Sequence, residues 1–133
     1  IRSYWGGMLD LGAVTFWEEY DPSVPKEEQY DMYGDHFGKS LCHAWAASPI
    51  YFLAKYFAGL DLVNKDGVTY VLKPQMQYFT DLDCILPVGS DGTVRLAWDG
   101  ECLEVTAEAE GGVLELGEEK ISLVRGETRR VKI

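Results

Sequence analysis

The sequence predicts an α+β protein, in which helices in the amino-terminal part precede an antiparallel β-sandwich. Residues 1–60 hold three of the four tryptophans and long apolar runs, whereas residues 68–133 consist of short β-like runs separated by Gly and Asp. Long apolar runs favour buried helices, and short alternating runs between turn residues favour sheets. The composition changes near the NKDG sequence at 64–67, so we expect two parts, 1–62 and 63–133.

The first helical segment is expected over residues 8–20. This run, MLDLGAVTFWEEY, is apolar on nearly every face, which indicates a segment buried on several sides. Residues 21–38 then contain two prolines, two glycines and several acidic residues, a composition typical of a long loop. Loops of this length are usually functional or mobile.

A second, longer helix is expected over residues 41–60. Ser40 is a candidate N-cap for it. Pro49 should kink or restart this helix, because it lacks a backbone donor and clashes with the preceding turn. Gly59 should end it.

The carboxyl-terminal half is expected to form a β-sandwich. Apolar and polar residues alternate along TVRLAW and CLEVTAE, as in sheets with one face on the core and the other in water. Turn signals such as SDG, WDG and EGG separate the runs. The expected strands are 68–74, 84–89, 93–100, 102–110, 113–117, 120–125 and 128–133.

The composition argues against several function classes. The formal net charge is −10 and the 12 Lys and Arg residues form no basic stripe, so nucleic acid is a poor candidate partner. No apolar run reaches the roughly 18 residues of a membrane span. The sequence has no GxGxxG, P-loop or HExxH motif, and we expect neither a cofactor nor a metal.

The cysteines bear on the cellular compartment of the chain, and the start of the sequence bears on whether it is part of a longer protein. Cys42, Cys84 and Cys102 are odd in number and far apart, so they are expected to be buried free thiols, which slightly favours the cytoplasm. The sequence begins at Ile1 and at once enters a Trp- and Gly-rich stretch. We therefore expect a fragment of a longer protein.

The first candidate site is the acidic cluster Glu18, Glu19 and Asp21, which is flanked by aromatic residues including Trp17. A carboxylate can activate water while an aromatic ring packs on the apolar face of a pyranose, so the pattern is typical of a sugar-cleaving site. Its structural alternative is a solvated helix end. Helical spacing does not choose between Glu18 and Glu19.

His43 is the second candidate, placed by the sequence in the first turn of the long helix. The positive end of the helix dipole disfavours the imidazolium there, and a neutral imidazole can both donate to and accept from sugar hydroxyls. A core histidine is the equally weighted alternative. A Cys42–His43 nucleophilic pair is excluded, because adjacent helical residues point about 100° apart.

Weaker features have more ordinary explanations. The DLD at 81–83 and the acidic loop at 27–35 offer oxygen ligands for calcium, but a solvated acidic surface explains them better. Trp98 is either an exposed sugar platform or a core residue of the sandwich, and the core is favoured.

The helical half resembles a known family. The run YWGGMLDLGAVTFWEEYDP, followed after a loop by YGDHFGKSLCHAWAASPIYFLAKYFAGL, is similar to the last helices of the (α/α)6, or six-hairpin, catalytic barrel of bacterial α-L-rhamnosidases. The rest of the chain resembles, less closely, their carboxyl-terminal β-sandwich. In that family the glutamate after the tryptophan of a GATTxWE-like motif is the general base, which maps onto Glu18. The histidine of the S-x-x-H motif contacts rhamnose, which maps onto His43. The motif's threonines correspond to Val14 and Thr15.

The resemblance implies hydrolysis with inversion. Glu18 would take a proton from the attacking water, while an acid about 6.5–9.5 Å away protonates the leaving oxygen. In the family that acid comes from earlier helices, so we expect the chain alone to be inactive. Its partners would be L-rhamnose-containing glycosides and the missing part of the same enzyme.

Two other functions fit the sequence. A non-catalytic carbohydrate-binding module would show saturable sugar binding by residues 68–133 alone. A structural domain would pair its apolar helices 8–20 and 40–58 with another subunit or with the missing barrel, and its exposed apolar surface would cause self-association.

Overall fold

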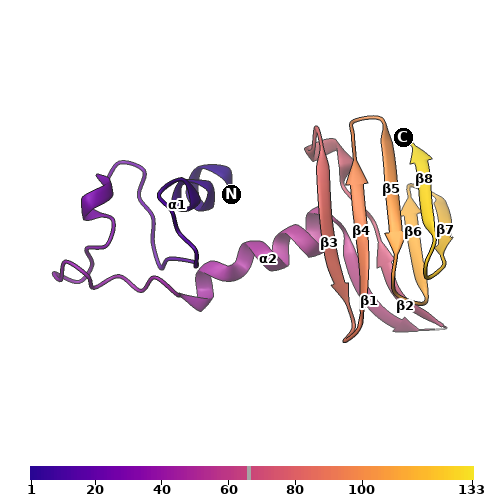
Figure 1. Cartoon of the computed structure of the whole chain (residues 1–133), viewed down its shortest axis with the longest axis horizontal. Helices are drawn as coiled ribbons and strands as arrows, with labels where there is room; N and C mark the ends of the chain where they lie inside the picture. Colours follow the sequence, from indigo (N-terminus) through magenta and orange to yellow (C-terminus); the bar gives the residue numbers. More distant parts are fainter. Residues whose placement is uncertain (66) are drawn as a thin grey trace. The chain divides into compact units, whose positions relative to one another are not determined.

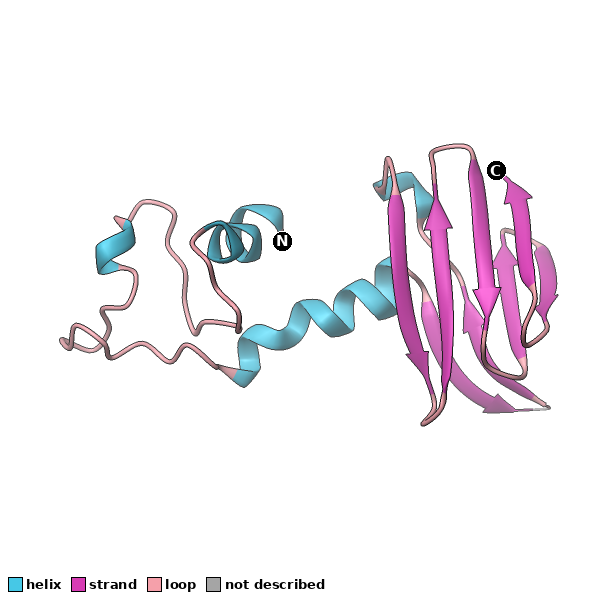
Figure 2. Cartoon of the chain, viewed as in Figure 1, coloured by secondary structure: helices cyan, strands magenta, loops and turns pink. Residues whose placement is uncertain are grey.

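The computed structural model describes residues 1–65 and 67–133 and shows an α+β chain of two compact units, Ile1–Tyr51 and Phe52–Ile133 (Figure 1). Figure 2 shows short helices and long loops in the first unit and mostly strands in the second. No helix among the described residues is long and apolar enough to cross a membrane.

The first unit contains less helix than the sequence predicts. A π-helical turn, Arg2–Gly6, continues into α1, Gly7–Asp10, and a 3₁₀ turn covers Lys26–Glu28. The predicted helix over 8–20 is therefore wrong beyond its first residues. Gly12, with a φ of 89°, lies just beyond the end of α1 and turns the chain out of the helical path.

The second helical segment begins at Ala44 and not after Ser40. A 3₁₀ turn, Ala44–Ala47, leads into α2, Ser48–Phe52, and then into a π-helical turn, Leu53–Phe57. The change to α-helix one residue before Pro49 agrees with a proline-induced restart. The predicted end at Gly59, whose φ is 74°, is confirmed. Residues 1–65 contain only these short helical segments and do not by themselves form an (α/α)6 barrel.

The second unit contains two four-stranded sheets. Their orders are β1-β2-β6-β7 and β3-β4-β5-β8. The strands are β1 Leu60–Lys65, β2 Val68–Leu72, β3 Leu82–Val88, β4 Gly92–Trp98, β5 Cys102–Ala107, β6 Gly112–Leu116, β7 Glu119–Leu123 and β8 Thr128–Lys132. All seven predicted strands are confirmed, and β1 was missed. The sheets are not wholly antiparallel, because β2 and β6 pair in parallel.

One hydrophobic core joins the two sheets in a sandwich-like arrangement. Tyr70, Leu72 and Leu114 from the first sheet are fully buried. Five residues of the second sheet are equally buried: Val94, Leu96, Leu103, Val105 and Ala107. Along β4 and β5 the buried residues recur at every second position, which confirms the predicted alternation.

Trp98 and the cysteines lie differently with respect to this core. Trp98 is half-buried against the core and donates its indole N–H to the Phe79 carbonyl oxygen at 3.2 Å, which agrees with the core interpretation. Cys84 and Cys102 are half-buried. Cys42 is exposed, so the prediction of a buried thiol is wrong there: it lies in a short loop before Ala44 and not in the predicted helix.

Candidate functional site

Two segments far apart in the sequence pair in the first unit and bring Glu18 and His43 to the same region. The Glu18 N–H donates to the Ser40 carbonyl oxygen at 2.8 Å, and the His43 N–H donates to the Phe16 carbonyl oxygen at 2.8 Å. The Thr15 hydroxyl also donates to the Leu41 carbonyl oxygen. The backbone of residues 15–18 is therefore held by residues 40–43 and not by a helix.

The Glu18 carboxylate is held at both oxygens. Oε1 accepts a hydrogen bond from the Tyr33 hydroxyl at 2.9 Å, and Oε2 accepts one from the Ser40 N–H at 3.1 Å. The Ser40 N–H, then the Tyr33 hydroxyl and more weakly electrostatic attraction by His43 and Lys39, lower the pKa of Glu18, against an opposing effect of partial desolvation. Glu18 is therefore ionised at neutral pH and can accept a proton.

The neighbouring carboxylates of the acidic cluster have other surroundings. Asp21 Oδ1 accepts hydrogen bonds from the Ser23 N–H at 2.8 Å and the Ser23 hydroxyl at 2.7 Å, which close a local turn and lower the Asp21 pKa. Glu19 is exposed. Of the three, Glu18 is the carboxylate that residues distant in the sequence hold in place.

Tyr33 reaches Glu18 from a tight turn. Met32 and Asp35 exchange backbone hydrogen bonds of 3.0 and 2.9 Å around Tyr33 and Gly34, whose φ angles are 56° and 82°. Two positive φ angles at the centre of a two-residue turn are the pattern of a type I′ turn, which favours Asn and Gly. A tyrosine in this conformation costs about 1–2 kcal/mol. A Cβ on Gly38 would lie 2.2 Å from the Met32 carbonyl oxygen, so the chain after the turn also requires glycine.

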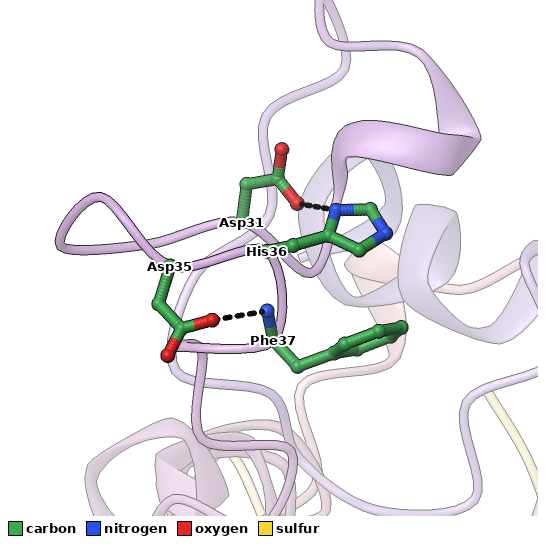
Figure 3. A network of polar contacts seen from close by, with 4 residues as sticks. All are labelled: Asp31, Asp35, His36 and Phe37. Atoms are coloured by element: carbon green, nitrogen blue, oxygen red, sulfur yellow. Dashed lines mark hydrogen bonds and ion pairs between the residues drawn. The ribbon is translucent and has the colours of Figure 1, made fainter.

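Polar and aromatic contacts support the turn. His36 Nδ1 lies 2.6 Å from Asp31 Oδ1, and the Phe37 N–H donates to Asp35 Oδ1 at 3.3 Å (Figure 3). The rings of Phe37 and Tyr30 stack with centroids 6.2 Å apart. The Asp31–His36 and Tyr30–Phe37 contacts thus join the chain before the turn to the chain after it.

Trp17 is part of this support. Its side chain is 4% exposed and its ring lies edge-on to Tyr30, with centroids 5.5 Å apart. The sequence predicts that this ring packs on a sugar, whereas in the structure the ring packs under the loop and almost none of its surface is open.

The long loop is also held by a buried amide. Gln29, 1% exposed, donates to the Asp21 carbonyl oxygen at 2.6 Å and to the Val24 carbonyl oxygen at 2.8 Å. Buried amides stabilise a loop when their hydrogen bonds are satisfied in this way. The predicted loop is confirmed, and it is an ordered one.

His43 directly precedes the helical segment, with φ −105° and ψ 117°. It is therefore the N-cap of that segment and does not lie in its first turn, where the sequence predicts it. Its half-buried ring lies beside Trp45, with centroids 6.4 Å apart. Trp45 is 87% exposed and is an aromatic surface that the sequence pattern did not single out. Its position two residues after the candidate histidine was the available signal.

No group of three or more His, Cys, Asp or Glu side chains within residues 1–65 and 67–133 is arranged to hold a metal ion. No protein-family model and no curated protein matches this sequence. The candidate site therefore stands on its geometry.

Proposed function

We propose that this chain carries the general base of an inverting α-L-rhamnosidase. Glu18 is the base and His43 a contact to the sugar. The observation that carries the proposal is the Glu18 carboxylate, which accepts hydrogen bonds from the Tyr33 hydroxyl at 2.9 Å and the Ser40 N–H at 3.1 Å.

The carboxylate retains the capacity to act on water. Two oxygens offer about four lone-pair positions, of which Tyr33 and Ser40 use two. A water held at a remaining position would give its proton to Glu18 as it attacks the anomeric carbon. Inversion needs a second carboxyl group about 6.5–9.5 Å away, which in this proposal belongs to a part of the enzyme outside this sequence.

Trp45 supplies the aromatic surface that such a site requires. It lies beside His43 and is 87% exposed, so its ring can stack on the apolar face of a sugar while the imidazole meets a hydroxyl. In this proposal Trp45 takes the role that the sequence suggested for Trp17, and Trp17 holds the loop that carries Tyr33.

In this proposal residues 1–62 are the end of a helical barrel and residues 63–133 its carboxyl-terminal sandwich, and exposed apolar side chains support the first assignment. Val14 is 95% exposed, Leu9 68% and Ile50 62%. In this proposal, neighbouring helices of the barrel would cover these side chains.

The test is turnover of p-nitrophenyl α-L-rhamnoside by the full-length enzyme with Glu18→Gln. This change keeps the shape but removes the base, so we expect turnover to fall by about 10²–10⁴-fold. Glu19→Gln is the matched control, because Glu19 is the adjacent but exposed carboxylate, and it should stay within a few-fold of wild type.

Two further readouts complete the test. The rhamnose first released should be the β-anomer, as inversion requires. The 133-residue chain alone should give no turnover, because in this proposal it lacks the carboxyl group that acts as general acid. Unchanged turnover in Glu18→Gln, with loss in Glu19→Gln, would show that the base was assigned to the wrong residue.

A further inference from the structure

We infer that Tyr33 is a positioning residue for the candidate base, whose phenolic hydroxyl holds Glu18 Oε1 so that the carboxylate keeps one orientation toward water. The inference rests on the proposed function for its catalytic meaning. The Tyr33–Glu18 hydrogen bond on which it is built lies within this chain and does not depend on the proposed function.

The two bonds to Glu18 come from different segments and act on different oxygens. Ser40 holds Oε2 through the backbone, and Tyr33 holds Oε1 through a side chain that is 15 residues away in the sequence. One bond would leave the carboxylate free to rotate about its last side-chain torsion, which is broad in energy. Two bonds fix its plane, and the lone pairs that remain point in defined directions.

The identity of residue 33 is otherwise unexplained by its surroundings. A type I′ turn favours Asn or Gly at this position, yet a tyrosine occupies it with a φ of 56°. The side chain is 84% exposed, so burial does not offset the strain. The hydroxyl bond to Glu18 is what the tyrosine adds, and strained positions of this kind are typical of functional sites.

The turn holds the backbone from which the phenol projects. Met32 and Asp35 exchange two backbone hydrogen bonds across the turn. Just after the turn, the Phe37 N–H donates to Asp35 Oδ1 (Figure 3). The direction in which the Tyr33 side chain leaves the backbone is thus set, so less conformational freedom is lost when the hydroxyl binds the carboxylate.

The experiment measures the ionisation of Glu18 in the chain itself, by NMR titration of the ¹³C-labelled glutamate carboxyl carbons. Tyr33→Phe removes only the hydroxyl, so the Glu18 pKa should rise toward its ordinary value, while the Ser40 bond keeps part of the depression. Tyr30→Phe is the control: it lies in the same loop, retains the ring that faces Trp17, and should leave the Glu18 pKa unchanged.

Tyr33→Asn separates positioning from a structural role. Asparagine suits the turn better than tyrosine, so the loop should be at least as stable, yet the Glu18 pKa should rise as in Tyr33→Phe. In the full-length enzyme both variants should lower kcat by about tenfold, the usual effect of one lost hydrogen bond, with KM little changed. The acid limb of the kcat/KM profile should move to higher pH.

An unchanged Glu18 pKa in Tyr33→Phe would overturn the inference, and so would wild-type kcat in Tyr33→Asn. A raised pKa in an enzyme that hydrolyses no rhamnoside would keep the Tyr33–Glu18 contact and overturn the proposed function instead.

Discussion

Residue by residue, the environment of each carboxylate decides what it can do. Glu18 and Glu19 are adjacent and chemically identical, but Glu18 accepts hydrogen bonds from Tyr33 and Ser40 whereas Glu19 faces water. The first is fixed in orientation and stays ionised to lower pH. The two adjacent carboxylates therefore differ because only Glu18 meets hydrogen-bond donors from distant segments.

Tyr70 shows the opposite case, a buried polar group without a partner. Its ring is fully buried above Gly112, where a Cβ would lie 2.3 Å from the Tyr70 Cζ atom. Within the described residues its hydroxyl makes no hydrogen bond, and burial raises the pKa of the phenol. Leaving a buried hydroxyl unpaired costs free energy.

We therefore expect Tyr70→Phe to stabilise the second unit by about 1 kcal/mol, because it removes the unpaired hydroxyl and keeps the ring. Urea unfolding followed by tryptophan fluorescence would measure this change in the free energy of unfolding. The slope of that free energy against urea concentration should be the same in the variant and the wild type. Tyr78→Phe, at a 66% exposed position, is the control and should be neutral. A loss of stability in Tyr70→Phe would mean that the hydroxyl is hydrogen-bonded in solution.

Among the elements, the end of the helical segment at Phe57 and the start of β1 at Leu60 are joined through Gly59. This residue has a φ of 74°, and a Cβ on it would lie 2.1 Å from the Lys73 carbonyl oxygen. The Lys73 N–H also donates to the Gly59 carbonyl oxygen at 3.0 Å. The close approach lets β1 begin directly against the chain that leaves β2.

Gly59→Ala should lower the free energy of unfolding by about 2–4 kcal/mol, since backbone strain and a main-chain clash act together. Gly89→Ala is the matched control: its φ is 66° but its Cβ would meet nothing within 4 Å, so strain alone should cost about 1 kcal/mol. Thermal unfolding of both variants gives the comparison. Equal losses would show that the clash at Lys73 relaxes without cost.

For the whole molecule, the hydrophobic core belongs to one unit. Every residue of the core cluster lies between Ala58 and Leu123, within the unit Phe52–Ile133. The unit Ile1–Tyr51 buries few side chains, among them Met8, Trp17 and Gln29. Its order rests on hydrogen bonds and ring contacts more than on apolar burial.

The segment 52–133 should therefore fold by itself, with a cooperative thermal transition and a dispersed amide NMR spectrum, because its whole core is local to it. In the complete chain, hydrogen exchange should be slowest in β2, β4, β5 and β6, and faster over residues 11–43 than in these strands. A collapsed, undispersed spectrum from 52–133 would show that the first unit is needed for folding of the sandwich.

The sequence by itself determined those features that local patterns encode. Alternation of apolar and polar residues located β4 and β5, turn residues separated the strands, and Gly59 marked the end of the helical segment. These are consequences of the periods of two and 3.6 residues and of glycine's access to positive φ. The motif order also selected Glu18 and His43 as candidates, and their catalytic roles remain predictions.

Only the tertiary structure decided features that depend on distant partners. Strand β1 escaped prediction because only its first residue is buried, so no alternation marks it. The parallel pairing of β2 with β6 and the path of residues 15–18 beside 40–43 join segments that local periodicity does not relate. The Tyr33–Glu18 contact arises in the same way: a turn that disfavours tyrosine locally is stabilised by a carboxylate 15 residues away. Local sequence pattern determines which side chains point toward the core and which toward water. Packing between distant segments determines which residues those side chains contact.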